Sequence, residues 1–234
     1  GLSIRKQSNS NAPTTNYQLP TTHSYDRFRN RIMFPITDAN ARVIGFGGRI
    51  FDSPKTANQS AEHANSFGLR DSASSQRESA GAEPSAPAKY INTPQTLLYD
   101  KSAVLYAFDK AKMAIRKENS CVVVEGYMDA LMAHQAGTEH VVAVSGTALT
   151  HRQLTLLRRL CDKISMSFDM DMAGELATRR SIDLALEMGF DVRALSLSTG
   201  KDPADLVRED AALWRETVTK ATDVISYFLT KALT

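Results

Sequence analysis

The sequence predicts an α/β fold in which helices cover both faces of a parallel sheet. Short runs of apolar residues, without polar alternation, recur from residue 121 onward. Segments with apolar residues at helical spacing separate these runs, and a glycine follows two of the segments. Parallel strands that are buried on both faces have such continuous apolar sequences, because the crossover helices shield them from water.

The predicted elements of this sheet alternate in a regular order. Strands are expected at 121–125, 141–145, 164–168 and 192–197, and helices at 127–136, 150–160 and 173–188. Thr150 is a suitable N-cap for the middle helix, and Gly137 and Gly189 suit the positions just after the other two. We therefore expect residues 121–201 to form one α/β subdomain. Residues 202–234 have a mostly helical pattern and are expected to begin another.

Residues 24–120 are predicted to form a basic α+β subdomain. Strands at 31–36 and 42–49, with a turn at 38–40 between them, make a hairpin. An extended segment at 88–96 and a helix at 103–117 follow. Residues 6–23 and 53–88 are rich in polar residues and have no apolar periodicity, so we expect flexible insertions there. The first insertion belongs to a starting segment at residues 1–23.

The composition excludes several classes of protein. The formal net charge of the 234 residues is only +2, so a nucleic-acid-binding surface would have to be local. Two cysteines, Cys121 and Cys161, lie far apart without a C-x-x-C pair, which argues against structural zinc and against a disulfide framework. No apolar run approaches the ~18 residues of a membrane span, and residues 1–10 lack the apolar core of a signal peptide.

Acidic residues follow three of the four predicted strands. Glu125 ends the first, Asp169 and Asp171 follow the third, and Asp202 follows the fourth. The carboxyl ends of parallel strands meet at one edge of a sheet, where ligands bind. Carboxylates gathered there would repel one another without a cation, and Mg²⁺ prefers a few carboxylates together with substrate phosphates. The sequence therefore predicts a magnesium site on Glu125, Asp169 and Asp171.

A single acid after a strand has a simpler explanation. Asp171 could merely cap the helix that begins near residue 173, and Asp129 could be an ordinary first-turn charge.

Other catalytic patterns do not match, since the sequence has no G-x-x-x-x-G-K-[ST] phosphate loop and its histidines lack metal-ligand spacing. Phosphatases of the haloacid dehalogenase type also carry Asp-x-Asp after a strand, but near the beginning of the domain.

Basic residues gather in the N-terminal half of the chain. Arg27, Arg29 and Arg31 alternate with other residues, and at the period of a strand they would share one face. Arginines with nearby aromatic side chains suit the phosphates of a single strand or of a nucleoside triphosphate. A solvated edge strand that is guarded by charge explains the same pattern, so both interpretations stay open.

Six segments resemble known motifs. The sequences VEGYMD at 124–129, SGT at 145–147 and FDMDMAG at 168–174 resemble the glutamate and Asp-x-Asp motifs of Toprim enzymes. Further upstream, YDRFRNRIMFPI at 25–36, VIGFGGR at 43–49 and KYINTP at 89–94 resemble bacterial-type replicative DNA primases. The resemblance covers nearly the whole chain apart from the two insertions. It implies a Toprim-type sheet at 121–201 and a DNA-directed RNA polymerase that makes short RNA primers on single-stranded DNA.

The resemblance also implies roles for individual residues. Glu125, Asp169 and Asp171 would hold catalytic Mg²⁺, with Mn²⁺ as the alternative ion, and Asp202 would join this acidic cluster. The template and nucleotide groove would be lined by Arg27, Arg29, Arg49, Lys89, Tyr90, Asn92, Lys101 and Thr147. A primer 3′-hydroxyl would attack the α-phosphate of a nucleotide, with metal ions activating the attacking oxygen and neutralising the leaving pyrophosphate.

Two positions depart from the family's pattern. Met170 stands between the two aspartates where the family has glycine, and Ala204 stands where Asp-Pro-Asp would place its second aspartate. These departures keep open a single-strand-binding module whose metal site has decayed. The Toprim motifs alone would also fit another Toprim enzyme, such as a nuclease or topoisomerase. A topoisomerase would also need a nucleophilic tyrosine on a separate domain, for which this length leaves little room.

The resemblance implies partners and a location as well. Single-stranded DNA would be the template and ribonucleoside triphosphates the substrates. A replicative helicase would be contacted through a domain that this fragment does not contain, and the fragment also lacks zinc-ribbon cysteines, so no zinc is expected in it. No membrane partner is expected. The bacterial cytoplasm is the expected location, with a eukaryotic organelle as the alternative.

Overall fold

The computed structural model describes residues 3–5, 24–51, 88–146, 148–167, 172–197 and 201–233. The predicted insertions at 6–23 and 53–88 lie outside the described residues, apart from Ala88. The described parts of Phe34–Phe46 and Thr93–Thr234 form one compact unit, and those of Leu2–Met33 and Gly47–Asn92 form a second. The subdomain boundaries after residues 120 and 201 stay predictions.

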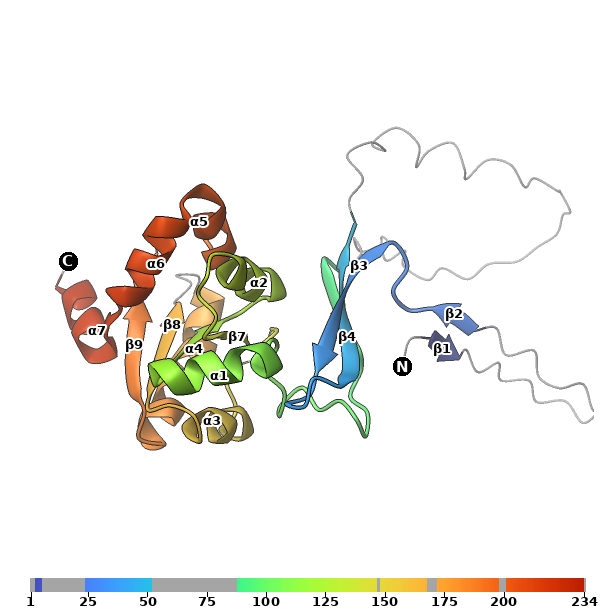
Figure 1. Cartoon of the computed structure of the whole chain (residues 1–234), viewed down its shortest axis with the longest axis horizontal. Coiled ribbons are helices and arrows are strands. Elements are labelled where there is room, and N and C mark those ends of the chain that lie inside the picture. Colours follow the sequence, from blue (N-terminus) through green and yellow to red (C-terminus); the bar gives the residue numbers. More distant parts are fainter. Residues whose placement is uncertain are drawn as a thin grey trace, which may run out of the picture. The chain divides into compact units, whose positions relative to one another are not determined.

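The first unit is built on a five-stranded sheet in the order β10-β9-β8-β6-β7, of which Figure 1 labels β7, β8 and β9. Its strands are β6 (Ser120–Val124), β7 (Val141–Ala143), β8 (Lys163–Ser167), β9 (Asp191–Leu195) and β10 (Thr222–Asp223). Strands β6 to β9 pair in parallel, as the apolar runs predicted, whereas the two-residue β10 pairs antiparallel with β9. The predicted α/β fold with a parallel sheet is therefore confirmed, with a short antiparallel strand added at one edge.

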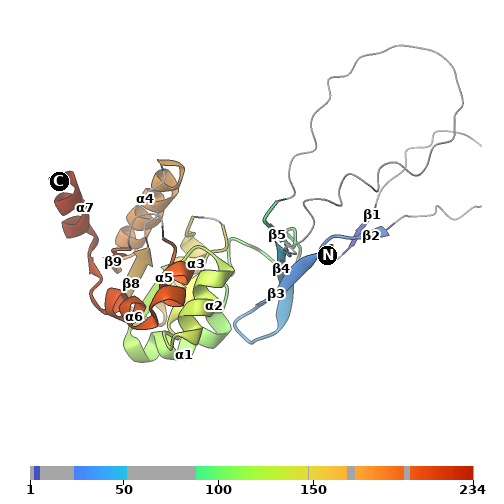
Figure 2. The same cartoon turned by 90° about the horizontal axis from the view of Figure 1, so that it is seen from above.

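Helices cover both faces of this sheet because β6, β7 and β9 present buried apolar side chains on both. Cys121 and Val123 pack on the face covered by α1, α3, α4 and α7, whereas Val122 and Val124 pack on the face covered by α2, α5 and α6. Helices α2, α5 and α6 lie side by side (Figures 1 and 2). The helices are α1 (Phe108–Glu118), α2 (Tyr127–Gln135), α3 (His151–Arg158), α4 (Met172–Glu187), α5 (Pro203–Glu209), α6 (Ala211–Thr219) and α7 (Val224–Ala232).

The predicted helix ends agree with the structure at three positions and differ at one. The Thr150 side chain accepts a hydrogen bond from the backbone N–H of Gln153, and Gly137 and Gly189 have φ values of +85° and +79°. The helix predicted from residue 103 begins only at Phe108. Tyr106 instead exchanges two backbone hydrogen bonds with Ala143 of β7, so the preceding residues extend the sheet edge before the helix starts.

A second, antiparallel sheet has the order β3-β4-β5, from strands β3 (Arg31–Thr37), β4 (Val43–Ile50) and β5 (Tyr90–Asn92). The Asp38 carboxylate accepts backbone hydrogen bonds from Asn40 and Arg42, which shapes the predicted turn and confirms the hairpin. Strands β1 (Ser3–Arg5) and β2 (Ser24–Asp26) pair antiparallel, which the sequence did not predict. Within the described residues, no helix combines the length and the apolar character that crossing a bilayer requires.

Candidate functional site

The sheet has a switch point between β6 and β8. The chain leaves β6 toward β7 on one side, and it leaves β8 toward β9 on the other side. Crossover connections that diverge in this way open a crevice at the carboxyl ends of the two strands, where ligands of α/β proteins bind. Glu125 is the residue directly after β6, so its carboxylate lies at this crevice.

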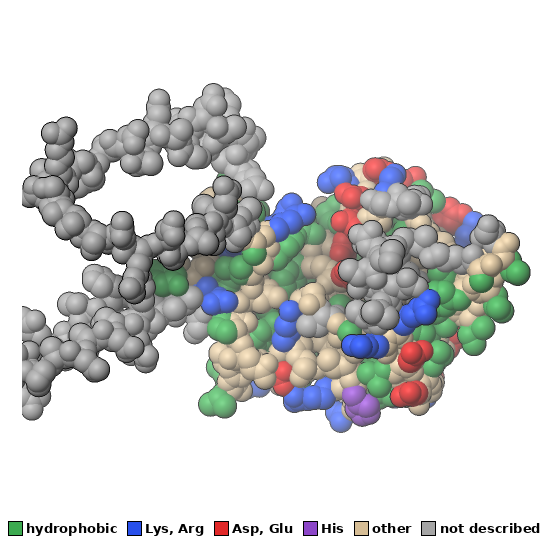
Figure 3. Space-filling view, turned by 180° about the vertical axis from the view of Figure 1, so that it is seen from behind, with side chains coloured by type: hydrophobic (Ala, Val, Ile, Leu, Met, Phe, Trp, Pro, Cys, Tyr) green, Lys and Arg blue, Asp and Glu red, His purple; other side chains and the backbone are tan. Residues whose placement is uncertain are grey.

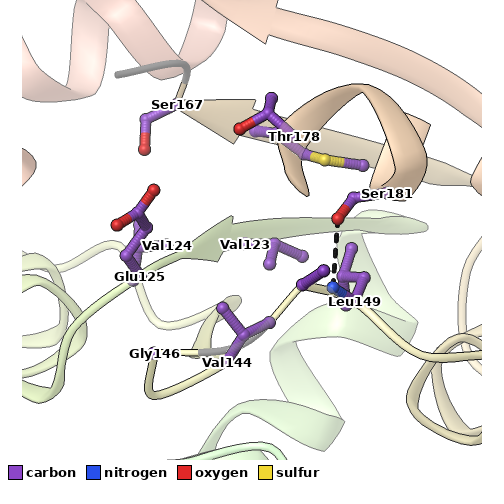
Figure 4. A pocket seen from close by; sticks show the side chains of 11 residues that line it. Val123, Val124, Glu125, Val144, Gly146, Leu149, Ser167, Thr178 and Ser181 are labelled. Atoms are coloured by element: carbon purple, nitrogen blue, oxygen red, sulfur yellow. Dashed lines mark hydrogen bonds between the residues drawn. The ribbon is translucent and has the colours of Figure 1, made fainter. Parts of the chain in front are cut away.

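A cavity of about 300 Å³ occupies the crevice. Its apolar wall includes Val123, Leu149 and Met166, and its polar groups include Glu125, Ser167, Thr178 and Ser181. Figure 4 shows the Glu125 carboxylate and the Ser167 hydroxyl at the same end of the cavity. At the other end, the Ser181 hydroxyl accepts a hydrogen bond from the backbone N–H of Leu149 at 3.0 Å, which ties α4 to the loop after β7 (Figure 4).

Asp129 is the residue of this site that the sequence did not single out. Its side chain accepts hydrogen bonds from the backbone N–H groups of Gly126 at 2.9 Å and Ala204 at 3.2 Å. Only 8% of the residue is exposed. Burial, and then the negative charges of Asp202 and Glu125, raise the pKa of Asp129 from 3.8 to about 6. The spacing of four from Glu125 was a usable signal, but an acid in the first turn of a helix has an ordinary explanation.

Asp202 approaches the same place from α5. Its carboxylate caps the helix by accepting a hydrogen bond from the backbone N–H of Asp205 at 2.7 Å, and Pro203 occupies the first helical turn. Because Asp129 holds the backbone of Ala204, it joins the start of α5 to the turn after β6. The structure therefore brings the predicted residues Glu125 and Asp202 together around Asp129, and Figure 3 shows a band of acidic side chains on one face of this unit.

Asp169, Asp171 and Thr147 lie outside the described residues, as does Met170. Strand β8 ends at Ser167, two positions before the first of these aspartates. Among the described residues alone, no three His, Cys, Asp or Glu side chains are placed to bind one metal ion. Of the four predicted metal ligands, the structure therefore describes only Glu125 and Asp202.

Among the described residues, Lys101 is the predicted nucleotide-binding residue that lies in the same unit as Glu125. Its amine donates a hydrogen bond at 3.5 Å to the backbone carbonyl of Gly146, and Gly146 lines the cavity. The ammonium group therefore reaches the wall of the crevice from a segment that belongs to neither a helix nor a strand. A positive charge at this place suits a phosphate group.

The other predicted basic residues lie in the second unit. The guanidinium of Arg49 lies 6.0 Å from the ring centre of Tyr90, directly across the β4–β5 pair, and that of Arg29 lies 5.3 Å from the ring centre of Tyr25. Both rings are exposed, with Tyr25 at 42% and Tyr90 at 36%. Lys89 lies just before β5, and Asn92 ends it. These cations and rings offer a surface that suits a nucleic-acid strand.

The prediction that Arg27, Arg29 and Arg31 share one face of a strand is wrong. Residues 27–30 form a turn between β2 and β3, and Asn30 has a φ of 51°, which interrupts the extended backbone. Arg31 instead donates hydrogen bonds to the backbone carbonyls of Gly48, Ala88 and Lys89, so its guanidinium holds β4 and the start of β5. Arg27 is half-buried, and its Nε makes no hydrogen bond to the part of the chain that the structure describes.

Gly48 shows why this hairpin contains glycine. A Cβ atom at that position would lie 2.6 Å from a ring carbon of Phe28, and Phe28 is 6% exposed. The glycine lets the turn before β3 pack directly on the backbone of β4. Any larger residue at Gly48 would have to displace Phe28 from this position.

Two family models match successive parts of the chain. The model for the DNA primase catalytic core, N-terminal domain, matches residues 4–112, and the Toprim-like model matches residues 122–207. A curated DNA primase of Clostridium acetobutylicum is 35% identical over 211 residues, which is 89% of this chain and 30% of that protein. The chain thus spans about a third of the length of this relative.

Solved structures agree with this match. A DNA primase domain from Pseudomonas aeruginosa is 30% identical with a TM-score of 0.72, and the match covers 99% of this chain and 60% of that one. The DnaG primase catalytic domain bound to single-stranded DNA is also 30% identical, with a TM-score of 0.68, over 91% of this chain and 60% of that one. On these matches and on its Toprim-type sheet, the chain belongs to the family of bacterial-type DNA primases, within their RNA polymerase domain.

Proposed function

We propose that the protein makes short RNA primers on single-stranded DNA by metal-dependent nucleotidyl transfer. The observation that carries the proposal is the proximity of Glu125 and Asp202 to Asp129, beside the switch-point cavity that Glu125 lines. Clustered carboxylates with a cavity beside them suit phosphoryl chemistry, because a bound cation offsets their mutual repulsion and also contacts substrate phosphates. The family of the chain supplies the specific reaction.

We propose Mg²⁺ as the cation, with Mn²⁺ as an alternative. The site fits a hard cation, because its donors are carboxylate oxygens and because the charges of Glu125 and Asp202 already disfavour ionised Asp129. Glu125 and Asp202 would hold the ion together with Asp169 and Asp171. When bound, the ion would activate the attacking primer hydroxyl and neutralise charge on the leaving pyrophosphate.

The chain's own residues would orient the reactants. Asp129 hydrogen-bonds the turn after Glu125 and the start of α5, so it keeps two acidic side chains at fixed positions. The Lys101 ammonium would bind the triphosphate, and Thr147 would lie near the incoming nucleotide. Arg27, Arg29, Arg49, Lys89, Tyr90 and Asn92 would bind the template. No protein nucleophile is required for this reaction.

The proposed partners follow from the same roles. Single-stranded DNA would be the template, which is supported by the similar catalytic domain that was solved bound to single-stranded DNA, and ribonucleoside triphosphates would be the substrates. A replicative helicase is a further proposed partner. Because the similar primases are bacterial, we propose that the protein acts in a bacterial cytoplasm.

The direct test is a synthesis assay. The intact protein is incubated with single-stranded DNA, ribonucleotides and Mg²⁺, and short RNA is sought on a denaturing gel. We expect RNA from the wild type and none from Asp169→Ala. Glu118→Ala is the matched control, because Glu118 is an exposed acid next to the opposite end of β6, and it should be fully active. Binding of single strands without any RNA synthesis would contradict the proposal, as would labelled phosphate trapped on Asp169.

A further inference from the structure

The segment that carries Lys101 depends on other elements for its shape. Residues 101–105 lie in a turn and an irregular stretch between β5 and α1. Such a stretch has no ladder of its own hydrogen bonds, so contacts from elsewhere must fix it. The position of the Lys101 amine, next to Gly146 at the cavity, therefore depends on what holds this backbone.

The side chain of Gln153 provides most of that support. Gln153 lies in the first turn of α3 and is completely buried. Its amide nitrogen donates to the backbone carbonyls of Lys101 at 3.2 Å and Val104 at 2.8 Å. Its amide oxygen accepts from the backbone N–H of Thr150 at 3.0 Å. One buried side chain thus bonds both ends of the irregular stretch to the start of α3.

Two neighbours of Gln153 hold the same stretch. The Thr150 hydroxyl donates to the backbone carbonyl of Ser102 at 2.5 Å. The guanidinium of Arg152 pairs with Asp100, and that carboxylate also accepts hydrogen bonds from the backbone N–H and the hydroxyl of Ser102. Residues 150, 152 and 153 therefore fix the backbone on both sides of Lys101. We name these three residues the α3 clamp.

The chemistry of the clamp goes beyond what a stable core needs. A leucine or methionine would fill the site of Gln153 with apolar atoms, as helices in cores commonly do. The amide nitrogen instead donates hydrogen bonds to two backbone carbonyls, those of Lys101 and Val104. A buried hydrogen-bond donor favours one backbone conformation of this stretch, whereas an apolar side chain would only fill the space.

We propose that Gln153 is a positioning residue for nucleotide binding, which acts by holding the Lys101 ammonium at the cavity. The inference rests on the proposed function, in which Lys101 binds the triphosphate. Gln153 itself is buried and would not touch the nucleotide. Its effect on nucleotide affinity must therefore pass through Lys101.

A double-mutant cycle tests this dependence. Binding of ATP with a fluorescent ribose label is measured in Mg²⁺ for the wild type, Lys101→Ala, Gln153→Met and the double variant. We expect Lys101→Ala to weaken binding about tenfold, the loss of one charge-assisted contact. Gln153→Met should weaken it about fivefold in the wild-type background and less than about 1.5-fold once Lys101 is alanine. The exposed Gln135→Met is the matched control and should change nothing.

The outcomes separate the two proposals. If Lys101→Ala leaves the affinity unchanged, the nucleotide-binding role of Lys101 fails, and the positioning role fails with it. If Lys101→Ala weakens binding but Gln153→Met does not, only the positioning role is overturned. An equal loss from Gln153→Met in both Lys101 backgrounds also overturns it, because a general disturbance of the fold would act without Lys101.

A second variant covers the case in which Gln153→Met does not fold. The Arg152 side chain is 65% exposed, so Arg152→Ala removes the ion pair with Asp100 without opening the core. We expect a smaller loss of affinity, about twofold, that again disappears in the Lys101→Ala background. Thermal unfolding and circular dichroism show which variants are folded at the temperature of the titration. A twofold loss that persists in both backgrounds would contradict the proposal.

Discussion

Two regions hold their functional side chains in different ways. One is the acidic edge of the parallel sheet, with Glu125, Asp129 and Asp202, and the other is the basic surface of the second unit, with Arg29 and Arg49. Asp129 and Asp202 are fixed by backbone N–H groups at strand and helix ends. Arg29 and Arg49 lie over exposed aromatic rings instead. The first arrangement sets positions closely, as metal chemistry requires. The second tolerates movement, which suits a flexible strand that is bound through its phosphates and bases.

The largest expected effect comes from the acidic edge. Glu125→Gln should lower primer synthesis about a thousandfold, equivalent to about 4 kcal/mol, because the variant loses a carboxylate that would hold the cation. The midpoint of thermal unfolding should stay near that of the wild type. The rate of RNA synthesis at saturating template is the measurement. A loss of tenfold or less would mean that Glu125 is not a metal ligand.

The stability of the acidic edge should depend on pH through Asp129. The pKa of Asp129 is about 6 in the folded protein against 3.8 as the ordinary value, so the folded state binds the proton more tightly. The contribution of this group to stability is therefore greatest below pH 4 and is lost as pH rises through 6, up to about 3 kcal/mol in total.

Replacing this carboxylate checks the sign of that dependence. Asp129→Asn cannot ionise, so its unfolding free energy should lack the decrease between pH 4 and pH 6 that the wild type shows. Urea unfolding in a chelating buffer measures both proteins, and Asp183→Asn, at an exposed position of α4, serves as the control. Parallel curves for the wild type and Asp129→Asn would contradict the assignment.

The basic surface should show a smaller effect. Arg49→Ala removes a cation that would contact template phosphate, so affinity for single-stranded DNA should fall about five- to tenfold, and the slope of log affinity against log salt should decrease by about 0.7. Mg²⁺ affinity should not change. Arg42→Ala, at the hairpin turn, is the control, because Arg42 pairs with Asp38. Unchanged binding in Arg49→Ala would remove this residue from the template surface.

The smallest effect is expected at Tyr25, where two variants separate the role of the ring from that of the hydroxyl. Tyr25→Ala should weaken single-strand binding about two- to fivefold, because Arg29 loses the ring beneath it, whereas Tyr25→Phe keeps the ring and should bind like the wild type. Fluorescence anisotropy of labelled DNA measures both. Equal losses in the two variants would show that the hydroxyl, rather than the ring, matters.

Local sequence pattern was enough to predict the parallel strands, the hairpin, the caps at Thr150, Gly137 and Gly189, and acids at the carboxyl edge of the sheet, of which the structure describes Glu125 and Asp202. These features depend on local pattern: continuous apolar runs, turn residues, and the rule that parallel strands end on the same side. Glu125 could be placed because it ends a predicted strand, and Asp202 because it follows one.

Which polar groups are buried, and which partners they bind, became clear only from the folded structure. From the sequence, Asp129 has the position of an ordinary helix charge. Its hydrogen bond from the backbone N–H of Ala204 forms because α5 packs on α2. Gln153 gave no signal, because the carbonyls that it holds lie about fifty residues earlier. The late start of α1 depends on a bridge to β7. Each of these contacts joins distant parts of the chain, and local periodicity carries no information about such partners.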